Sequence, residues 1–132
     1  MLTGMKKHLP TVAGVVLGLL FVMSAVMVLF KLAPTPEVPE GTPIAHFFAA
    51  FGPTGYMTFI KVIELLGGIL VAIPRTRNLG LLLLVPIIVN ILAFHVFVTG
   101  GHGLLEPMLG VLVGLAVYLL WVGRRGIAGL LN

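Results

Sequence analysis

The feature that most constrains this chain is a series of four apolar stretches, each close to the length that crosses a membrane. They run from about Thr11 to Phe30, Tyr56 to Ile73, Leu79 to Val98 and Pro107 to Val122. A helix needs about 20 apolar residues to cross a hydrocarbon core of about 30 Å. The sequence therefore predicts an all-α integral membrane protein, built as a bundle of four transmembrane helices.

The composition excludes a water-facing exterior. Of the 132 residues, 59% are hydrophobic and 9% charged, whereas a soluble domain carries about 25% charged residues. The length suits one domain, so we expect a single membrane domain over residues 1–132. There is no cysteine, which excludes thiolate chemistry. The eight cations form no basic run, so nucleic acid is not an expected partner.

The first apolar stretch has a competing interpretation as a signal peptide, because Lys6 and Lys7 precede it. Its apolar run is longer than the roughly 7–15 residues of a signal core, and no small-x-small cleavage site precedes Lys31. We therefore expect a membrane helix here.

The cations predict the orientation, because Lys and Arg in short loops collect on the cytoplasmic side. With four spans, the N-terminus, the loop after the second span and the C-terminus share one side of the membrane. Each carries a pair of cations: Lys6 and Lys7 at the N-terminus, Arg75 and Arg77 in the loop, and Arg124 and Arg125 at the C-terminus. The outer loops carry one cation and three acids, namely Lys31, Glu37, Glu40 and Glu106. We expect a multi-pass protein of the inner (cytoplasmic) membrane with both termini in the cytoplasm.

The two outer connections differ in kind. The first, residues 31–55, is rich in proline and contains the octet Ile44–Phe51, which is too short to span. Its three phenylalanines favour a short interfacial helix or a re-entrant segment between the first and second spans. The second, Thr99–Glu106, contains three glycines without the Lys-Ser/Thr of a phosphate loop, and indicates a flexible turn.

Two glycine stripes predict close helix packing. Gly14 and Gly18 in the first span, and Gly110 and Gly114 in the fourth, each form a small-xxx-small pattern that lets membrane helices approach closely. Such stripes serve packing within the bundle or association into a homo-oligomer. The alternative is that glycine is simply common in membrane helices.

Lys61 and Glu64 are ionisable residues inside an apolar span, which makes them functional candidates. Three residues apart on a helix, their side chains leave about 60° from each other and can pair. Counted from Tyr56, they lie about 8 and 12 Å below the outer surface. Asn90 in the third span falls at a depth similar to that of Glu64.

His95 lies closer to the outer surface than Asn90 and about 140° away from it around the helix, so we expect it to face the outer loops or His46. The whole set predicts a polar pocket opening outward, with these ligand-binding candidates: Lys61, Glu64, Asn90, His95, Tyr56 and His46. The structural alternative stays open: an ion pair that only fixes the second span, with Asn90 in an interhelical hydrogen bond.

The sequence indicates neither a metal site nor a nucleophile. No two His or Glu residues have the i, i+3 or i, i+4 spacing of metal ligands on one helix. Ser24 is the only serine and lies outside any Gly-x-Ser-x-Gly motif. We assign no catalytic residue and leave open whether the protein is an enzyme.

Several segments resemble the DoxX-like family of small four-span bacterial membrane proteins. The resemblance is carried by Lys61–Gly68 (KVIELLGG), Pro74–Gly80 (PRTRNLG), Pro86–Asn90 (PIIVN) and His95, with Phe30–Leu32 and Thr54–Tyr56 upstream. It implies a four-helix membrane protein associated with membrane oxidoreductases and quinone-linked thiosulfate oxidation. It also implies that Lys61, Glu64, Gly68, Asn90 and His95 are pocket residues.

The leading functional hypothesis is therefore a membrane protein that binds a quinone, a lipid or another amphipathic small molecule in an outer-half pocket. It would serve as a subunit or accessory of a membrane oxidoreductase system, with electrons from a partner, because the chain has no cofactor motif of its own. The alternative is a purely structural subunit that docks on a larger complex. Transport is a third hypothesis, and it would require the protein to dimerise.

Overall fold

The computed structural model describes residues 2–32, 38–101 and 104–129, and these ranges are helical without any strand. The helices are α1 (Leu2–Leu29), α2 (Pro43–Phe51), α3 (Tyr56–Ala72), η1 (Pro74–Thr76), α4 (Arg77–Ala93), η2 (Phe94–Val98), α5 (Pro107–Val122) and α6 (Arg124–Ala128). Glu37 and residues 102–103 of the expected flexible turn lie outside the described residues, as does the side chain of Lys6. The predicted all-α class is confirmed.

Two helices are long and apolar enough to cross a membrane, Lys7–Leu29 and the continuous stretch Pro74–Val98. A third span arises if α2 and α3 are counted together, although they are bent by 86°. The helix α5 is apolar but shorter. The chain is thus compatible with membrane insertion, while a bundle of four spans stays a prediction.

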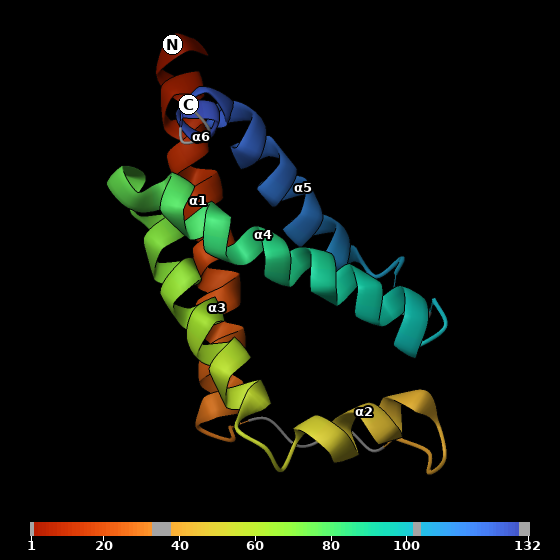
Figure 1. The fold of residues 1–132 in the computed structure, drawn as a ribbon. Coiled ribbons are helices and arrows are strands. Elements are labelled where there is room, and N and C mark those ends of the chain that lie inside the picture. The colour runs from red at the N-terminus through yellow and green to blue at the C-terminus, as the bar shows by residue number, and fades with distance from the viewer. Residues whose placement is uncertain (1, 33–37, 102–103, 130–132) are drawn as a thin grey trace.

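The helices form two arms that meet at one end (Figure 1). In the first arm α3 runs antiparallel to α1 along most of its length, and in the second α4 leaves the top of α3 and α5 returns beside it. The start of α1 and the short helix α6 lie at the end where the arms meet. At the other end, α2 crosses below the gap between the arms.

The first glycine stripe packs α1 against α3, as predicted. A Cβ atom at Gly18 would collide with the carbonyl oxygen of Gly68, and one at Gly14 would lie 2.7 Å from the carbonyl oxygen of Val71. Gly80 at the start of α4 approaches the backbone of Val71 in the same way. Glycine is required here because the backbones themselves are in contact.

The second stripe packs against no described part of the chain, so the expected packing within the bundle is not observed for it. A Cβ atom at Gly110 or Gly114 would meet no atom within 4 Å. The helix α5 instead turns its buried side chains, Leu109, Ala116 and Leu119, toward the other helices. At 100° per residue, the two glycines fall on the far side of the helix from these contacts.

The core lies where α1, α3, α4 and α5 come together. It is built from Ala13, Leu17, Phe21, Val71, Leu81, Leu84, Ile87, Ile88, Ala116 and Leu119. The outward side of α1 is also apolar, with Val12, Leu19 and Met23 each more than half exposed. An exterior of large apolar side chains suits lipid as the surrounding solvent.

The segment before α3 forms the short helix expected there. Thr42 caps α2 by accepting a hydrogen bond from the backbone N–H of Ala45 at 3.3 Å, and Pro43 occupies its first turn. A bend of 86° separates α2 from α3. No residue of α2 is fully buried.

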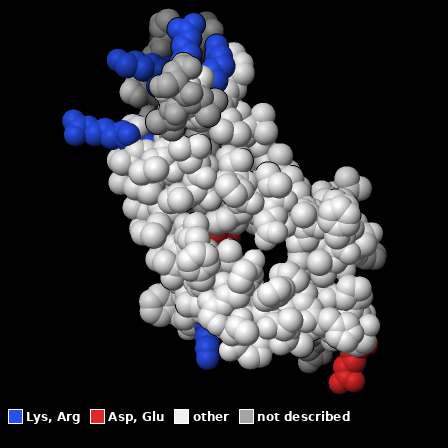
Figure 2. Space-filling view, in the orientation of Figure 1, with Lys and Arg blue, Asp and Glu red and all other residues white. Residues whose placement is uncertain are grey.

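The charged side chains are unevenly distributed. Figure 2 shows most Lys and Arg side chains at the end where the arms meet, and acidic side chains at the opposite end. Arg77 folds back onto α1, where its Nη2 donates a hydrogen bond to Thr11 Oγ1 at 3.1 Å. This cation contributes to packing as well as to the charge of that end.

Candidate functional site

The central polar feature is the ion pair between Lys61 and Glu64 on α3. Lys61 Nζ lies 2.8 Å from Glu64 Oε2, and the side chains are 14% and 4% exposed. The predicted pairing is therefore present. It follows from the i, i+3 spacing, which brings two side chains onto one face of a helix.

The carboxylate is incompletely satisfied. Glu64 Oε2 is buried and accepts no hydrogen bond, even though Lys61 Nζ is within ion-pairing distance. The contact between these two atoms is an ion pair. A buried oxygen without a hydrogen bond is costly, so this atom is suited to a further donor.

Ser24 joins this pair, although the sequence analysis gave it no role. Lys61 Nζ donates a hydrogen bond to Ser24 Oγ at 3.2 Å, which connects α3 to α1. The two residues are 37 positions apart in the chain. The one available signal was that Ser24 is the only serine, in an otherwise apolar helix.

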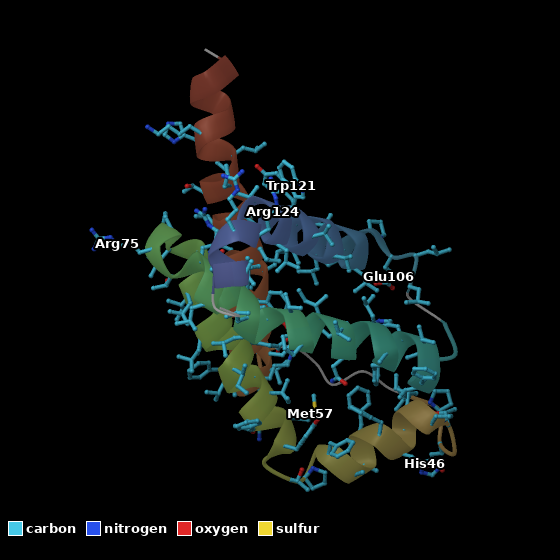
Figure 3. All side chains as sticks on the ribbon, turned by 45° about the horizontal axis from the view of Figure 1, so that its top comes forward. His46, Met57, Arg75, Glu106, Trp121 and Arg124 are labelled. Atoms are coloured by element: carbon cyan, nitrogen blue, oxygen red, sulfur yellow. The ribbon has the colours of Figure 1, made fainter. Side chains whose placement is uncertain are left out.

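The pair lies beside a hollow between the two arms. Figure 2 shows this hollow, with acidic atoms recessed at its edge. Among the acids with described side chains, Glu64 is the buried one. Met57, about one turn before Lys61 on α3, projects toward the space between α3 and α2 (Figure 3). In this view the hollow thus carries an acidic position at its edge, while the described surfaces around it bear no other charged side chain.

Asn90 is exposed, and its side chain makes no hydrogen bond with another described residue. It lies seven residues after Leu83, whose Cβ comes within 3.4 Å of a Cβ built on Gly67 of α3. Seven residues are close to two helical turns, so Asn90 lies on the same face of α4 as Leu83. In the first half of α4, this face packs against α3. The predicted interhelical hydrogen bond to α3 is absent.

Three other predicted pocket residues lie elsewhere. Gly68 is buried against the backbone of Gly18, so it is a packing position and not a ligand contact. Tyr56 is 43% exposed and its ring lies 4.6 Å from that of Phe51. His46 is exposed on α2, at its outward edge in Figure 3.

An aromatic cluster holds α2 beneath the second arm. The ring of Phe94 in η2 lies 4.9 Å from Phe47 and 6.2 Å from Phe48. Phe47 also contacts Phe51, at 4.9 Å. The cluster lies at η2, a π-helical turn, and such turns occur frequently at functional sites.

His95 follows Phe94 and faces the outer connections, as expected. Its Nδ1 lies 2.8 Å from the carbonyl oxygen of Ile91, and its ring borders an open cavity of about 570 Å³. The segment around the start of α2 contributes Pro39, Thr42, Pro43 and Ile44 to this cavity. The π-helical segment adds Phe94, His95 and Thr99, and the N-cap of α5 adds Glu106.

The residues that were expected to line one pocket therefore lie at two separate places, the ion pair on α3 and the outer cavity at His95. The lining of the outer cavity includes none of Lys61, Glu64 and Asn90. The physical reason is that α4 diverges from α3, which carries His95 away from the ion pair. Within the described ranges, no three His, Asp or Glu side chains are grouped so that they could hold a metal ion.

Comparison with known proteins identifies one related sequence. The chain is 33% identical over 100 residues to the uncharacterized protein YwoB of Bacillus subtilis (strain 168). The match covers 73% of this chain and 62% of that protein, so the chain spans less than two thirds of the relative's length. No protein-family profile and no solved structure matches. The resemblance to DoxX-like proteins stays a prediction.

Proposed function

We propose that this protein is a four-span membrane protein of the DoxX-like type that binds an amphipathic molecule, such as a quinone, in the hollow beside Lys61 and Glu64. In this proposal the polar head of the ligand meets the ion pair and its apolar body lies among the side chains of the two arms. The observation that carries the proposal is the buried Glu64 Oε2, which accepts no hydrogen bond.

The chemistry of the three polar side chains complements such a ligand. Lys61 and the amide of Asn90 are donors for a carbonyl oxygen. Glu64 accepts from a hydroxyl and is able to exchange a proton with it. Because the side-chain amide of Asn90 makes no hydrogen bond with another described residue, a ligand in the hollow would supply the partner that this amide lacks.

The four-span arrangement is supported by the charge distribution and by helix length. At about 1.5 Å per residue, the 16 residues of α5 extend about 24 Å, and Trp121 and Arg124 near its end are typical of a membrane interface. Arg124 lies over the Trp121 ring, 4.3 Å from its centroid. We place this end, with both termini, in the cytoplasm.

A partner supplies the electrons if the ligand is turned over, because the chain contains no cofactor motif. We propose a membrane oxidoreductase subunit for this role. A homo-oligomer would use the face of Gly110 and Gly114, since nothing in the described chain approaches it. Gly14 and Gly18 are already occupied by α3.

One observation favours the structural alternative. The hydrogen bond from Lys61 to Ser24 joins α1 to α3, so the ion pair has a packing role even without a ligand. In that case the protein would be an accessory subunit whose hollow stays empty of specific ligands.

Quinone binding by the purified full chain in nanodiscs distinguishes the two functions. We expect saturable binding of ubiquinone-1, weakened about tenfold in Glu64→Gln and in Asn90→Leu through loss of one charge-assisted or buried hydrogen bond. Thr58→Val changes an exposed residue of the same helix and serves as the control.

Mass spectrometry of gently purified protein completes the test. A quinone or lipid retained in stoichiometric amount by the parent protein, and lost from Glu64→Gln, supports the proposal. A folded Glu64→Gln variant that binds the quinone as tightly as the parent contradicts it. A stoichiometric protein partner on an empty bundle favours the accessory role.

A further inference from the structure

The outer cavity is a second place where the structure brings polar groups together, separate from the hollow beside Lys61. Three segments distant in sequence build it: residues 39–44, the π-helical turn and its end, and the N-cap of α5. Its volume of about 570 Å³ falls within the roughly 300–1,000 Å³ of small-molecule sites. No Lys or Arg lines it.

The imidazole of His95 presents an acceptor. Its Nδ1 lies 2.8 Å from the carbonyl oxygen of Ile91, and because a carbonyl only accepts, Nδ1 carries the proton. In the neutral ring the other nitrogen, Nε2, is then the acceptor. The backbone contact thus selects the tautomer that leaves a lone pair available on Nε2.

Glu106 supplies a negative charge that no described residue neutralises. Its side chain forms no capping hydrogen bond to α5, and no hydrogen bond or ion pair joins it to another described residue. Thr42 adds a further acceptor, because its hydroxyl proton is already donated to the carbonyl oxygen of Pro39 at 2.7 Å. The polar groups of the wall therefore offer lone pairs and one negative charge.

We propose that this cavity binds a protonated amine attached to an apolar body. An ammonium group carries donors and a positive charge, which match the acceptors of His95, Glu106 and Thr42. The apolar wall of Pro43, Ile44 and Phe94 suits the remainder of the molecule. An anion would be repelled by Glu106, and a metal ion would find fewer than three His, Asp or Glu side chains grouped among the described residues.

The same chemistry is available from two sources, a free amphipathic amine and the ethanolamine headgroup of a phospholipid. The first experiment uses the full chain in nanodiscs of phosphatidylcholine, a lipid whose headgroup has no N–H donor. There, we titrate tryptamine and its neutral analogue N-acetyltryptamine. The second experiment repeats the titration in nanodiscs that also contain phosphatidylethanolamine.

We expect saturable binding of tryptamine and none of N-acetyltryptamine. Glu106→Gln should weaken tryptamine binding at least about tenfold, because it removes a charge-assisted contact. Glu40→Gln removes the same charge from an exposed residue outside the cavity lining and should change binding less than about twofold. His95→Phe keeps a ring but removes Nε2, and should also weaken binding.

The outcomes distinguish the two sources of the amine and also test whether the cavity binds an amine at all. Competition by phosphatidylethanolamine identifies the headgroup as the occupant, and undiminished binding identifies a free amine; both support an amine site. The proposal is overturned if tryptamine does not bind saturably in phosphatidylcholine, if N-acetyltryptamine binds equally well, or if Glu106→Gln and Glu40→Gln have the same effect. Quinone binding is a separate measurement, so either site can fail alone.

Discussion

Lys61 and Glu64 show how an apolar helix accommodates two charges. Each charge would be costly alone in a medium of low dielectric, and pairing offsets part of that cost. The environments of the two partners differ, because the ammonium also bonds Ser24 while Glu64 Oε2 accepts no hydrogen bond. The carboxylate therefore depends more strongly on the pair than the ammonium does.

This asymmetry makes a prediction for stability. Lys61→Met leaves Glu64 as a buried unpaired charge and should destabilise the protein by about 3 kcal/mol, in the range measured for broken buried pairs. Glu64→Gln should cost less, because Lys61 keeps Ser24 and is more exposed. The double variant should lose less than the sum of both. Reversible unfolding in detergent measures this cycle, and additive losses would show that the pair is not coupled.

At the scale of the helices, close backbone contact is concentrated in one arm. The helices α1 and α3 meet through Gly18 and Gly68, whereas the glycines of α5 face open space. The helix α2 is held in another way, by aromatic rings and without a fully buried residue. The two arms are therefore joined tightly at one end, and α2 attaches loosely at the other.

The two glycine stripes provide a matched pair of substitutions. Gly18→Leu places a side chain against the Gly68 carbonyl and should force α1 from α3, at a cost of about 1–3 kcal/mol or more. Gly114→Leu has the same chemistry in open space and should leave the stability of the monomer nearly unchanged. Thermal unfolding in detergent compares them. Equal destabilisation by both would contradict the packing described here.

At the scale of the whole molecule, basic and acidic side chains are concentrated at opposite ends (Figure 2). Cations gather where the arms meet, and Glu106 lies at the other end of α5 from Trp121 and Arg124 (Figure 3). The hollow and the outer cavity lie away from the basic end. In the proposed orientation, both sites are on the outer side of the membrane.

The topology is testable with single cysteines, because the chain has none of its own. Ala49 on α2 and Ala128 on α6 are both exposed, and three proposed spans separate them. In right-side-out membrane vesicles, Ala49→Cys should react with an impermeant maleimide, and Ala128→Cys only after permeabilisation. Reaction of both before permeabilisation would show that α3, α4 and α5 do not all cross the membrane, and the reverse pattern would invert the orientation.

The sequence by itself determined the helical class, the approximate helix positions and the pairing of Lys61 with Glu64. The physical reason is that these features are local. Backbone groups in an apolar medium must be satisfied within each segment, so long apolar runs become helices. Residues three apart on one helix lie near each other in any packing.

Only the tertiary structure decided which helix faces meet. It brought Ser24 to Lys61, placed Gly68 in a backbone contact and left the Gly110 and Gly114 face open. It also set His95 against the outer connections, apart from the ion pair. These results depend on the rotation and divergence of whole helices, which arise from side-chain packing between segments distant in sequence. Spacing along one helix carries no information about them.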